Sequence, residues 1–245
     1  MKPILIHVPH SSLFIPEEYR KTTLVSQKEL DEENSLMCDT GVLDLIPPAL
    51  KSQTIAFPYS RLYCDVERLR DGNEPMEAYG MGYIYTHSSK GNELFRPSEA
   101  HKKRINEIYE SHHSELNKRA TEILNEYGKC LIIDLHSFGE EMVNRLFGWT
   151  SFPDICIGTE SNHYSEDVVK SMQEICDMFG LSTELNYPYS GSIVPRAYYG
   201  RRGTGIVSVM IEINKRVLLP GNEECLRSRC HSFLSSAGGL SCSPS

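Results

Sequence analysis

Short continuous runs of apolar residues alternate along the chain with longer segments in which apolar residues recur at helical spacing. A run without alternation is typical of a strand that is covered on both faces of a sheet. Such runs predict strands at Pro3–Val8, Gln53–Phe57, Leu131–Ile133, Asp154–Gly158 and Ile206–Ile213. Because helical segments separate most of these strands, the pattern predicts an α/β fold with three layers, an αβα sandwich.

Amphipathic spacing predicts helices in four segments, which run from Glu29 to Leu45, from Arg96 to Tyr127, from Tyr164 to Phe179 and from about 223 to 234. The second segment has the clearest apolar face at 3.6-residue spacing. That face is formed by Ile105, Ile108, Tyr109, His112, Leu116, Ala120, Ile123 and Leu124. The stretch Asp71–Lys90 is rich in Gly, Tyr and Met and predicts a long irregular loop, which is often a functional element in a compact domain.

The composition is that of an ordinary globular protein and restricts its partners. A chain of 245 residues can form one large α/β domain, which we expect over residues 1–234, and the small, polar residues 235–245 predict a flexible tail. The net charge of −8 argues against nucleic acid or an anionic membrane as the main partner. The composition leaves the oligomeric state open.

Localisation follows from the absence of targeting signals in the sequence. No apolar segment approaches the roughly 20 residues of a membrane helix, and the N-terminal apolar run is too short for a signal peptide. We therefore expect a cytoplasmic protein. The eight cysteines are scattered without a C-x-x-C pair, so we interpret them as reduced thiols.

Polar residues follow or interrupt several of the predicted strands. His10 follows the first strand, Asp134 and His136 follow the third, and Glu212 lies in the last. If these strands are parallel neighbours, their carboxyl ends meet at one edge of the sheet. Histidine and carboxylate ligands with one open position are typical of a catalytic zinc site. The pattern alone also permits a structural interpretation, in which His136 only hydrogen-bonds to its neighbours.

Seven segments in order resemble the N-formylglutamate amidohydrolase (N-formylglutamate deformylase) family, which is related to the zinc carboxypeptidase and aspartoacylase group. The segments are Pro9–Ser12, Asp39–Gly41, Ser60–Arg68, Asp134–Ser137, Ile157–Thr159, Arg196–Gly200 and Ile211–Glu212. The first resembles the family's Pro-His-small-Gly loop, and the fourth is similar to its Asp-x-His-Ser motif. The resemblance implies a phosphorylase/hydrolase-like fold with a mixed, mainly parallel sheet, one zinc ion, and hydrolysis of an amide bond.

The resemblance also implies which residues hold the metal. His10 and His136 correspond to the two histidine ligands. The wider group takes its third ligand from a Glu three residues after the first histidine, but Leu13 stands there in this chain. Asp39 and Glu67 are the two candidates for the third ligand, and we favour Asp39 because its motif matches that of the deformylases.

The remaining roles are carried over in the same way. Glu212 corresponds to the general base, which takes a proton from water and returns it to the leaving amine. Arg61 is expected to stabilise the oxyanion, and Asp134 is expected to orient His136.

Substrate binding is assigned by the resemblance to Arg68, Arg196, Asp65 and Glu67, with the arginines suited to bidentate recognition of a carboxylate. The chain departs from the family pattern in three places. Glu67 replaces an Asn, Gly41 an Asp, and Pro195 a Thr. We therefore expect an N-formyl- or N-acyl-amino acid, or a short peptide, as the small-molecule substrate. The alternatives are a catalytically silent carboxylate-binding protein on the same fold and a zinc carboxypeptidase-like peptidase.

Overall fold

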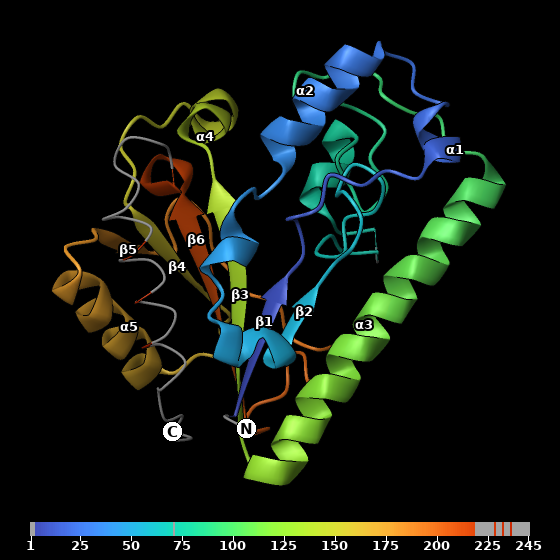
Figure 1. Ribbon diagram of the computed structural model, residues 1–245. Helices are drawn as coiled ribbons and strands as arrows, with labels where there is room; N and C mark the ends of the chain where they lie inside the picture. Colours follow the sequence, from blue (N-terminus) through green and yellow to red (C-terminus); the bar gives the residue numbers. More distant parts are fainter. Residues whose placement is uncertain (1–2, 71, 219–227, 229–231, 233–235, 237–245) are drawn as a thin grey trace. The chain divides into compact units, whose positions relative to one another are not determined.

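The computed structural model describes residues 3–70, 72–218, 228, 232 and 236 (Figure 1). The chain divides into two compact units. The first unit contains Met1–Val8, Gly41–Ile55 and Leu116–Ser245, and the second contains Pro9–Thr40 and Ala56–Glu115. Apart from three single residues, the predicted last helix at about 223–234 and the predicted tail at 235–245 lie outside the described residues.

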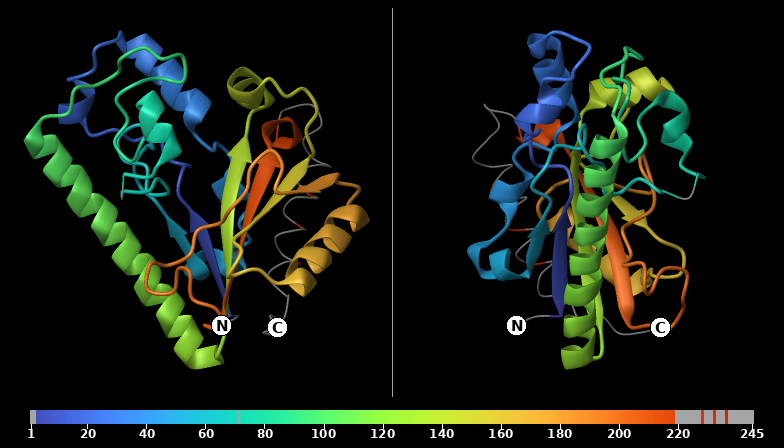
Figure 2. Two further views of the ribbon diagram at one scale, coloured as in Figure 1. Left: turned by 180° about the vertical axis from the view of Figure 1, so that it is seen from behind. Right: turned by 90° about the vertical axis from the view of Figure 1, so that its right-hand side faces the viewer.

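A six-stranded sheet with the order β2-β1-β3-β6-β4-β5 forms the first unit (Figure 1). The strands are β1 (Ile4–Val8), β2 (Thr54–Ala56), β3 (Cys130–Phe138), β4 (Ile155–Thr159), β5 (Thr183–Leu185) and β6 (Ile206–Asn214). β3 is parallel to both β1 and β6, β4 is parallel to β5, and β4 is antiparallel to β6. Figure 2 shows β6 between β3 and β4 from behind. The predicted α/β fold with a mixed, mainly parallel sheet is confirmed.

The helices agree with the prediction in two segments and differ in a third. The α-helices of the described residues are α1 (Glu17–Arg20), α2 (Gln27–Met37), α3 (Glu99–Tyr127), α4 (Glu140–Phe147) and α5 (Glu166–Met178). The 3₁₀ helices are η1 (Val42–Leu45), η2 (Pro48–Gln53), η3 (Pro75–Tyr79) and η4 (Lys215–Leu218). α3 and α5 confirm the predicted second and third helices. The single helix predicted from Glu29 to Leu45 is wrong, because Cys38 is extended and Gly41 has a φ of 87°, so the chain turns between α2 and η1.

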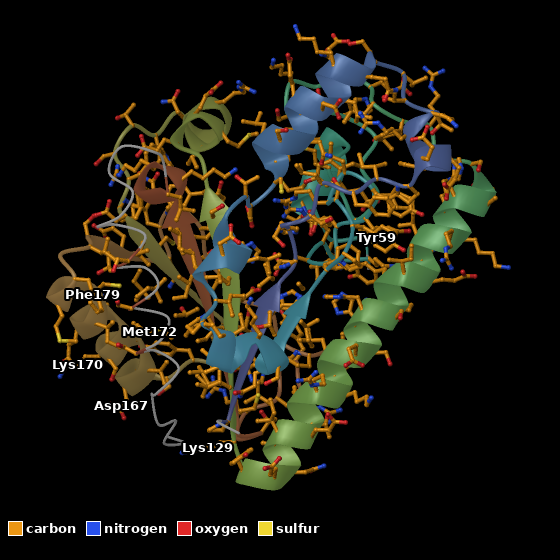
Figure 3. The ribbon with its side chains drawn as sticks, in the orientation of Figure 1. Tyr59, Lys129, Asp167, Lys170, Met172 and Phe179 are labelled. Carbon is orange, nitrogen blue, oxygen red and sulfur yellow. The ribbon has the colours of Figure 1, made fainter. Side chains whose placement is uncertain are left out.

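One face of the sheet is largely apolar. Ile4, Ile133 and Ile211 on this face belong to a buried cluster with Met172 of α5. Figure 3 shows Met172 on the side of α5 nearer the sheet, whereas Lys170 and Asp167 on the same helix are exposed. Burial of a side chain of this size contributes roughly 1.5–3 kcal/mol, so this face provides much of the stability of the unit.

The opposite face changes from apolar to polar along the strands. Leu5 of β1 and Ile132 of β3 lie in a buried cluster with Leu116 and other residues of the C-terminal part of α3. Two residues further along the same face, because side chains alternate along a strand, come His7 on β1 and Asp134 on β3. On this face the titratable groups therefore begin at the level of His7 and Asp134 and continue with His136 and Glu212.

The second unit is built from α1, α2, the first part of α3 and irregular segments around an aromatic core. Tyr19, Leu62, Tyr85 and Phe95 are almost completely buried in this core. The long irregular loop predicted at Asp71–Lys90 is present over its described part, with η3 as its regular turn. In the chain as described, no helix has the length and apolar character that a membrane span requires.

Candidate active site

His10 is the centre of a polar cluster in the second unit. Its side chain is 2% exposed, and its Nε2 atom lies 2.9 Å from Oδ1 of Asp65. On the other side of the ring, Nδ1 lies 3.8 Å from Oδ2 of Asp39 and 3.8 Å from Oε2 of Glu67. The two residues that the sequence leaves as candidates for a third metal ligand therefore face the same imidazole nitrogen.

Asp65 is ionised, although it is fully buried. Burial alone would raise the pKa of Asp65, but the Arg61 guanidinium and then His10 hold this pKa well below its ordinary value. Arg61 donates to Oδ2 of Asp65 from Nε at 3.1 Å and from Nη2 at 2.8 Å. Nε of Arg68 lies 3.6 Å from the same oxygen, and the Tyr85 hydroxyl donates to it at 3.5 Å. Both carboxylate oxygens are thus occupied by side chains of the second unit.

The protonation of Asp65 determines the proton position on His10. An ionised carboxylate can only accept hydrogen bonds, so the proton of the neutral imidazole lies on Nε2. Burial, followed by the charge of Arg61, lowers the pKa of His10, which favours the neutral ring at pH 7. Nδ1 therefore presents its lone pair toward Asp39 and Glu67. A cation stabilises such a group of three acceptors, and imidazole with carboxylate is a donor set that zinc accepts.

Backbone contacts explain why these distant parts of the sequence meet. The amide of Asp39 donates to the carbonyl of His10 at 2.8 Å. The amide of Glu67 donates to Oδ1 of Asp65 at 3.1 Å, which closes a tight turn and brings Glu67 back toward His10. Asp39 lies beyond the C-terminal end of α2.

Asp134 is the centre of a second cluster, in the first unit. Its Oδ1 atom lies 2.8 Å from Nδ1 of His7 and 3.3 Å from Nε2 of His136, and its Oδ2 atom accepts from the amide of Ile193 at 2.9 Å. Burial alone would raise the pKa of Asp134, but His136 and then His7 hold it well below its ordinary value. Asp134 therefore contacts His136, as the resemblance implies. β3 continues to Phe138, so both residues lie within the strand and not beyond its end.

Glu212 of β6 is the register partner of His136 of β3. Since register partners on neighbouring strands project from the same face, the carboxylate and the imidazole lie side by side. Glu212 is 8% exposed and lies in a strand that is apolar apart from Ser208, Glu212 and Asn214. On the other side of β6, Cys156 is the register partner of Glu212. Burial, with a further effect of the Glu212 charge, raises the pKa of the Cys156 thiol to about 11.

Arg196 lies on an exposed turn in the first unit, where the amides of Tyr198 and Tyr199 donate to the carbonyl of Pro195. The segment before this turn is fixed to the sheet, because the Ser208 hydroxyl donates to the carbonyl of Ile193. The turn that carries Arg196 therefore follows a segment that is hydrogen-bonded to β6.

His7 is completely buried, and the structure adds a contact of its Nδ1 atom with Oδ1 of Asp134 at 2.8 Å. The available signal was the spacing of His7 and Asp134 at equivalent points of two predicted parallel strands, but only the strand register identifies them as partners. Sequence reasoning assigned Asp65 to substrate binding. The structure surrounds this carboxylate with His10, Arg61 and Arg68.

The family model for N-formylglutamate amidohydrolase matches residues 2–219 of the chain. The N-formylglutamate amidohydrolase from Ralstonia eutropha JMP134 has a similar structure, with a TM-score of 0.80 and 20% sequence identity over 98% of this chain and 94% of that one. A gene product from Agrobacterium tumefaciens is similar with a TM-score of 0.69 and 19% identity, over 96% of this chain and 90% of that one. These two structures support the fold. Among curated proteins, none matches the chain by sequence.

Proposed function

Because the chain belongs to the N-formylglutamate amidohydrolase family, we propose that it is a zinc-dependent hydrolase of the amide bond of an N-formyl- or N-acyl-amino acid. The observation that carries the metal dependence is the arrangement around His10. A buried, ionised Asp65 holds one ring nitrogen, and the other faces two carboxylates. Metal-binding histidines characteristically donate their second ring N–H to a carboxylate in this way.

We assign the zinc ligands to His10, His136 and Asp39. Oδ1 of Asp134 lies 3.3 Å from Nε2 of His136, so a buried carboxylate lies beside each of the two histidines. The lone pair of His10 that faces Asp39 and Glu67 is on Nδ1. Bound zinc would supply Lewis-acid chemistry, which polarises an amide carbonyl and lowers the pKa of water.

Glu212 is the proposed general base. Its carboxylate lies beside His136 on the same face of the sheet, in a buried environment in which it can take a proton from the attacking water. The same carboxylate then gives the proton to the nitrogen of the leaving amine. Such proton transfer contributes typically 10²- to 10⁴-fold to the rate.

Arg61 and Arg68 are the proposed anion-binding groups, with Arg61 acting on the oxyanion of the transition state and Arg68 on the substrate carboxylate. Both guanidinium groups are oriented by Asp65, with Arg61 donating through Nε and Nη2 and Arg68 approaching within 3.6 Å. Asp65 contributes to substrate binding through these two arginines. Arg196 on its exposed turn and Glu67 are the further substrate contacts in this proposal.

Metal analysis together with a substrate panel tests the proposal. We expect near-stoichiometric zinc in protein purified under metal-replete conditions, and its loss in His136→Ala. The panel contains N-formyl, N-acetyl and N-succinyl amino acids and short peptides, and we expect hydrolysis of an N-formyl or N-acyl amino acid. Absence of zinc would support a silent carboxylate-binding protein. Zinc with hydrolysis of peptides alone would support a carboxypeptidase-like enzyme.

A further inference from the structure

We propose that Tyr109 and His113 of α3 are positioning residues, which fix the backbone of segment 65–70 on both sides of two substrate-binding side chains. These side chains are Glu67 and Arg68, so the inference rests on the proposed function. The observation that carries it is a pair of hydrogen bonds from the helix to the backbone of the segment. The Tyr109 hydroxyl donates to the carbonyl of Arg68 at 2.7 Å. Nε2 of His113 lies 2.8 Å from the carbonyl of Val66.

The two donors share one face of the helix. Tyr109 and His113 are four residues apart on α3, so their side chains are neighbours on its surface. Their ring centroids are 4.5 Å apart, and the two residues are only 3% and 5% exposed. A carbonyl oxygen can only accept, so Nε2 of His113 is the donor of its hydrogen bond. One buried face of α3 therefore binds two carbonyls of the same short segment.

The first of the two peptide groups joins Val66 to Glu67, and it is held at both ends. Its carbonyl accepts from His113. Its N–H, which belongs to Glu67, donates to Oδ1 of Asp65 at 3.1 Å. Because a peptide group is planar, a partner at each end determines its orientation.

The second peptide group follows Arg68 and is held in the same way. Its carbonyl accepts from Tyr109, and its N–H, which belongs to Leu69, donates to Oε2 of Glu74 at 3.0 Å. Glu74 is 9% exposed, and its other oxygen lies 3.7 Å from Nη1 of Arg68. The backbone is therefore fixed immediately before Glu67 and immediately after Arg68.

The end of the segment is attached to the same helix through Arg70. The guanidinium carbon of Arg70 lies 4.9 Å from the ring centroid of Tyr109 and 5.1 Å from that of Tyr83. Arg70 also forms an ion pair with Glu110 of α3. The ring of Tyr109 thus contacts Arg70, whereas its hydroxyl binds the carbonyl of Arg68. The two contacts can be separated by removal of the hydroxyl alone.

A fixed backbone matters because Arg68 carries a long side chain with several rotatable bonds. Ordering such a side chain when a ligand binds costs affinity, and order that exists before binding reduces this cost. The contact of Arg68 with the substrate carboxylate is made in the ground state and in the transition state alike. Loss of the contacts from α3 should therefore raise KM and leave kcat nearly unchanged.

Four substitutions separate positioning from packing. Tyr109→Phe removes one oxygen and keeps the ring. His113→Leu removes the other donor, whereas His113→Gln keeps an amide N–H near the position of Nε2. Thr22→Val is the matched control in the same unit, because the Thr22 hydroxyl also donates to a backbone carbonyl at 2.7 Å, that of Tyr19. If His113→Leu does not fold, Tyr109→Phe still decides.

Steady-state hydrolysis of N-formylglutamate gives the first readout, with the zinc content and thermal midpoint of each variant measured in parallel. We expect Tyr109→Phe and His113→Leu to raise KM by about 10-fold, which is the order of one buried hydrogen bond, with kcat within about two-fold of wild type. We expect His113→Gln to restore most of the KM and Thr22→Val to keep it even where its midpoint falls. A wild-type KM in Tyr109→Phe would overturn the proposal, as would an equal rise in Thr22→Val.

Amide hydrogen exchange in segment 65–70 gives a second readout, which does not depend on activity. We expect the amides of Glu67 and Leu69 to exchange faster in Tyr109→Phe than in wild type and at the wild-type rate in Thr22→Val. Unchanged exchange in Tyr109→Phe would contradict the proposal. If the wild-type protein does not hydrolyse N-formylglutamate, the proposed function fails for this substrate, and the exchange rates still decide whether α3 positions the segment.

Discussion

Asp65 holds the Nε2 atom of His10 at 2.9 Å, and this contact turns the opposite nitrogen of the ring toward two carboxylates. The same Asp65 binds the guanidinium of Arg61 through its second oxygen. One buried carboxylate therefore orients both a proposed metal ligand and a proposed anion-binding group. Metal affinity and substrate binding should consequently fail together when Asp65 is changed.

Asp65→Asn tests this coupling. The amide cannot balance the charge of Arg61, and removal of one partner from a buried ion pair costs roughly 3–5 kcal/mol. We expect a lower free energy of unfolding by about that amount in urea titrations and a loss of about 10- to 100-fold in zinc affinity. Asp31→Asn is the control in the same unit, since Asp31 pairs with Arg20 at the surface and such pairs contribute at most about 1 kcal/mol. A variant with wild-type stability and zinc affinity would show that Asp65 holds neither group.

Asp39→Asn and Glu67→Gln decide the third ligand. Both carboxylates lie 3.8 Å from Nδ1 of His10, so the distances alone do not rank them. We expect Asp39→Asn to abolish stoichiometric zinc binding and Glu67→Gln to retain it, with the effect of Glu67→Gln seen mainly in KM. Both variants keep the volume of the side chain, which makes metal content after dialysis a direct comparison. The reverse order of zinc loss would reassign the ligand to Glu67.

The sequence predicts the elements whose pattern is long or strongly apolar. The start of α3 was predicted within three residues and its end at Tyr127, because the apolar face of the helix recurs from Ile105 to Leu124. β6 was predicted because Ile206–Ile213 is mostly apolar. α4 was missed, since its eight residues are too short for a periodic signal. β5, with three residues, gave no strand signal.

The site was predictable as a set of residues but not as a set of contacts. The motifs of the family identify His10, Asp65 and His136, which the structure includes in its two polar clusters. Their partners depend on tertiary structure. The pairing of His7 with Asp134 follows from the register of β1 and β3, which no local pattern contains.

The acid stability of the first unit should depend on Asp154. Burial alone would raise the pKa of Asp154, but hydrogen bonds from Ser182 and then the Arg216 guanidinium hold this pKa below its ordinary value. A carboxyl whose pKa is lower in the folded state binds fewer protons there than in the unfolded chain, so stability rises with pH. The contribution is complete above the unfolded pKa and is lost as pH falls through the folded pKa.

Asp154→Asn should therefore be less stable than wild type at pH 7 by about 1–3 kcal/mol, because it removes hydrogen bonds between charged groups. The difference should shrink as pH falls below the unfolded pKa of about 4 and toward the lower folded pKa, where the wild-type carboxyl becomes protonated. Urea titrations between pH 3 and pH 7 measure both effects, with the exposed Asp167→Asn of α5 as control. A stability difference that is constant over this pH range would show that the Asp154 charge has no part in it.

Glu212→Gln should separate proton transfer from metal binding. The amide keeps the size of the side chain beside His136 but cannot accept a proton from water, so we expect kcat to fall by roughly 10²- to 10⁴-fold. Zinc content and thermal midpoint should stay close to wild type, because Glu212 is a base and not a ligand in the proposed mechanism. If the variant hydrolyses the best substrate at the wild-type rate, Glu212 is not the base. If zinc is lost instead, the carboxylate that lies beside His136 is a ligand, and the base must be sought elsewhere in the cluster.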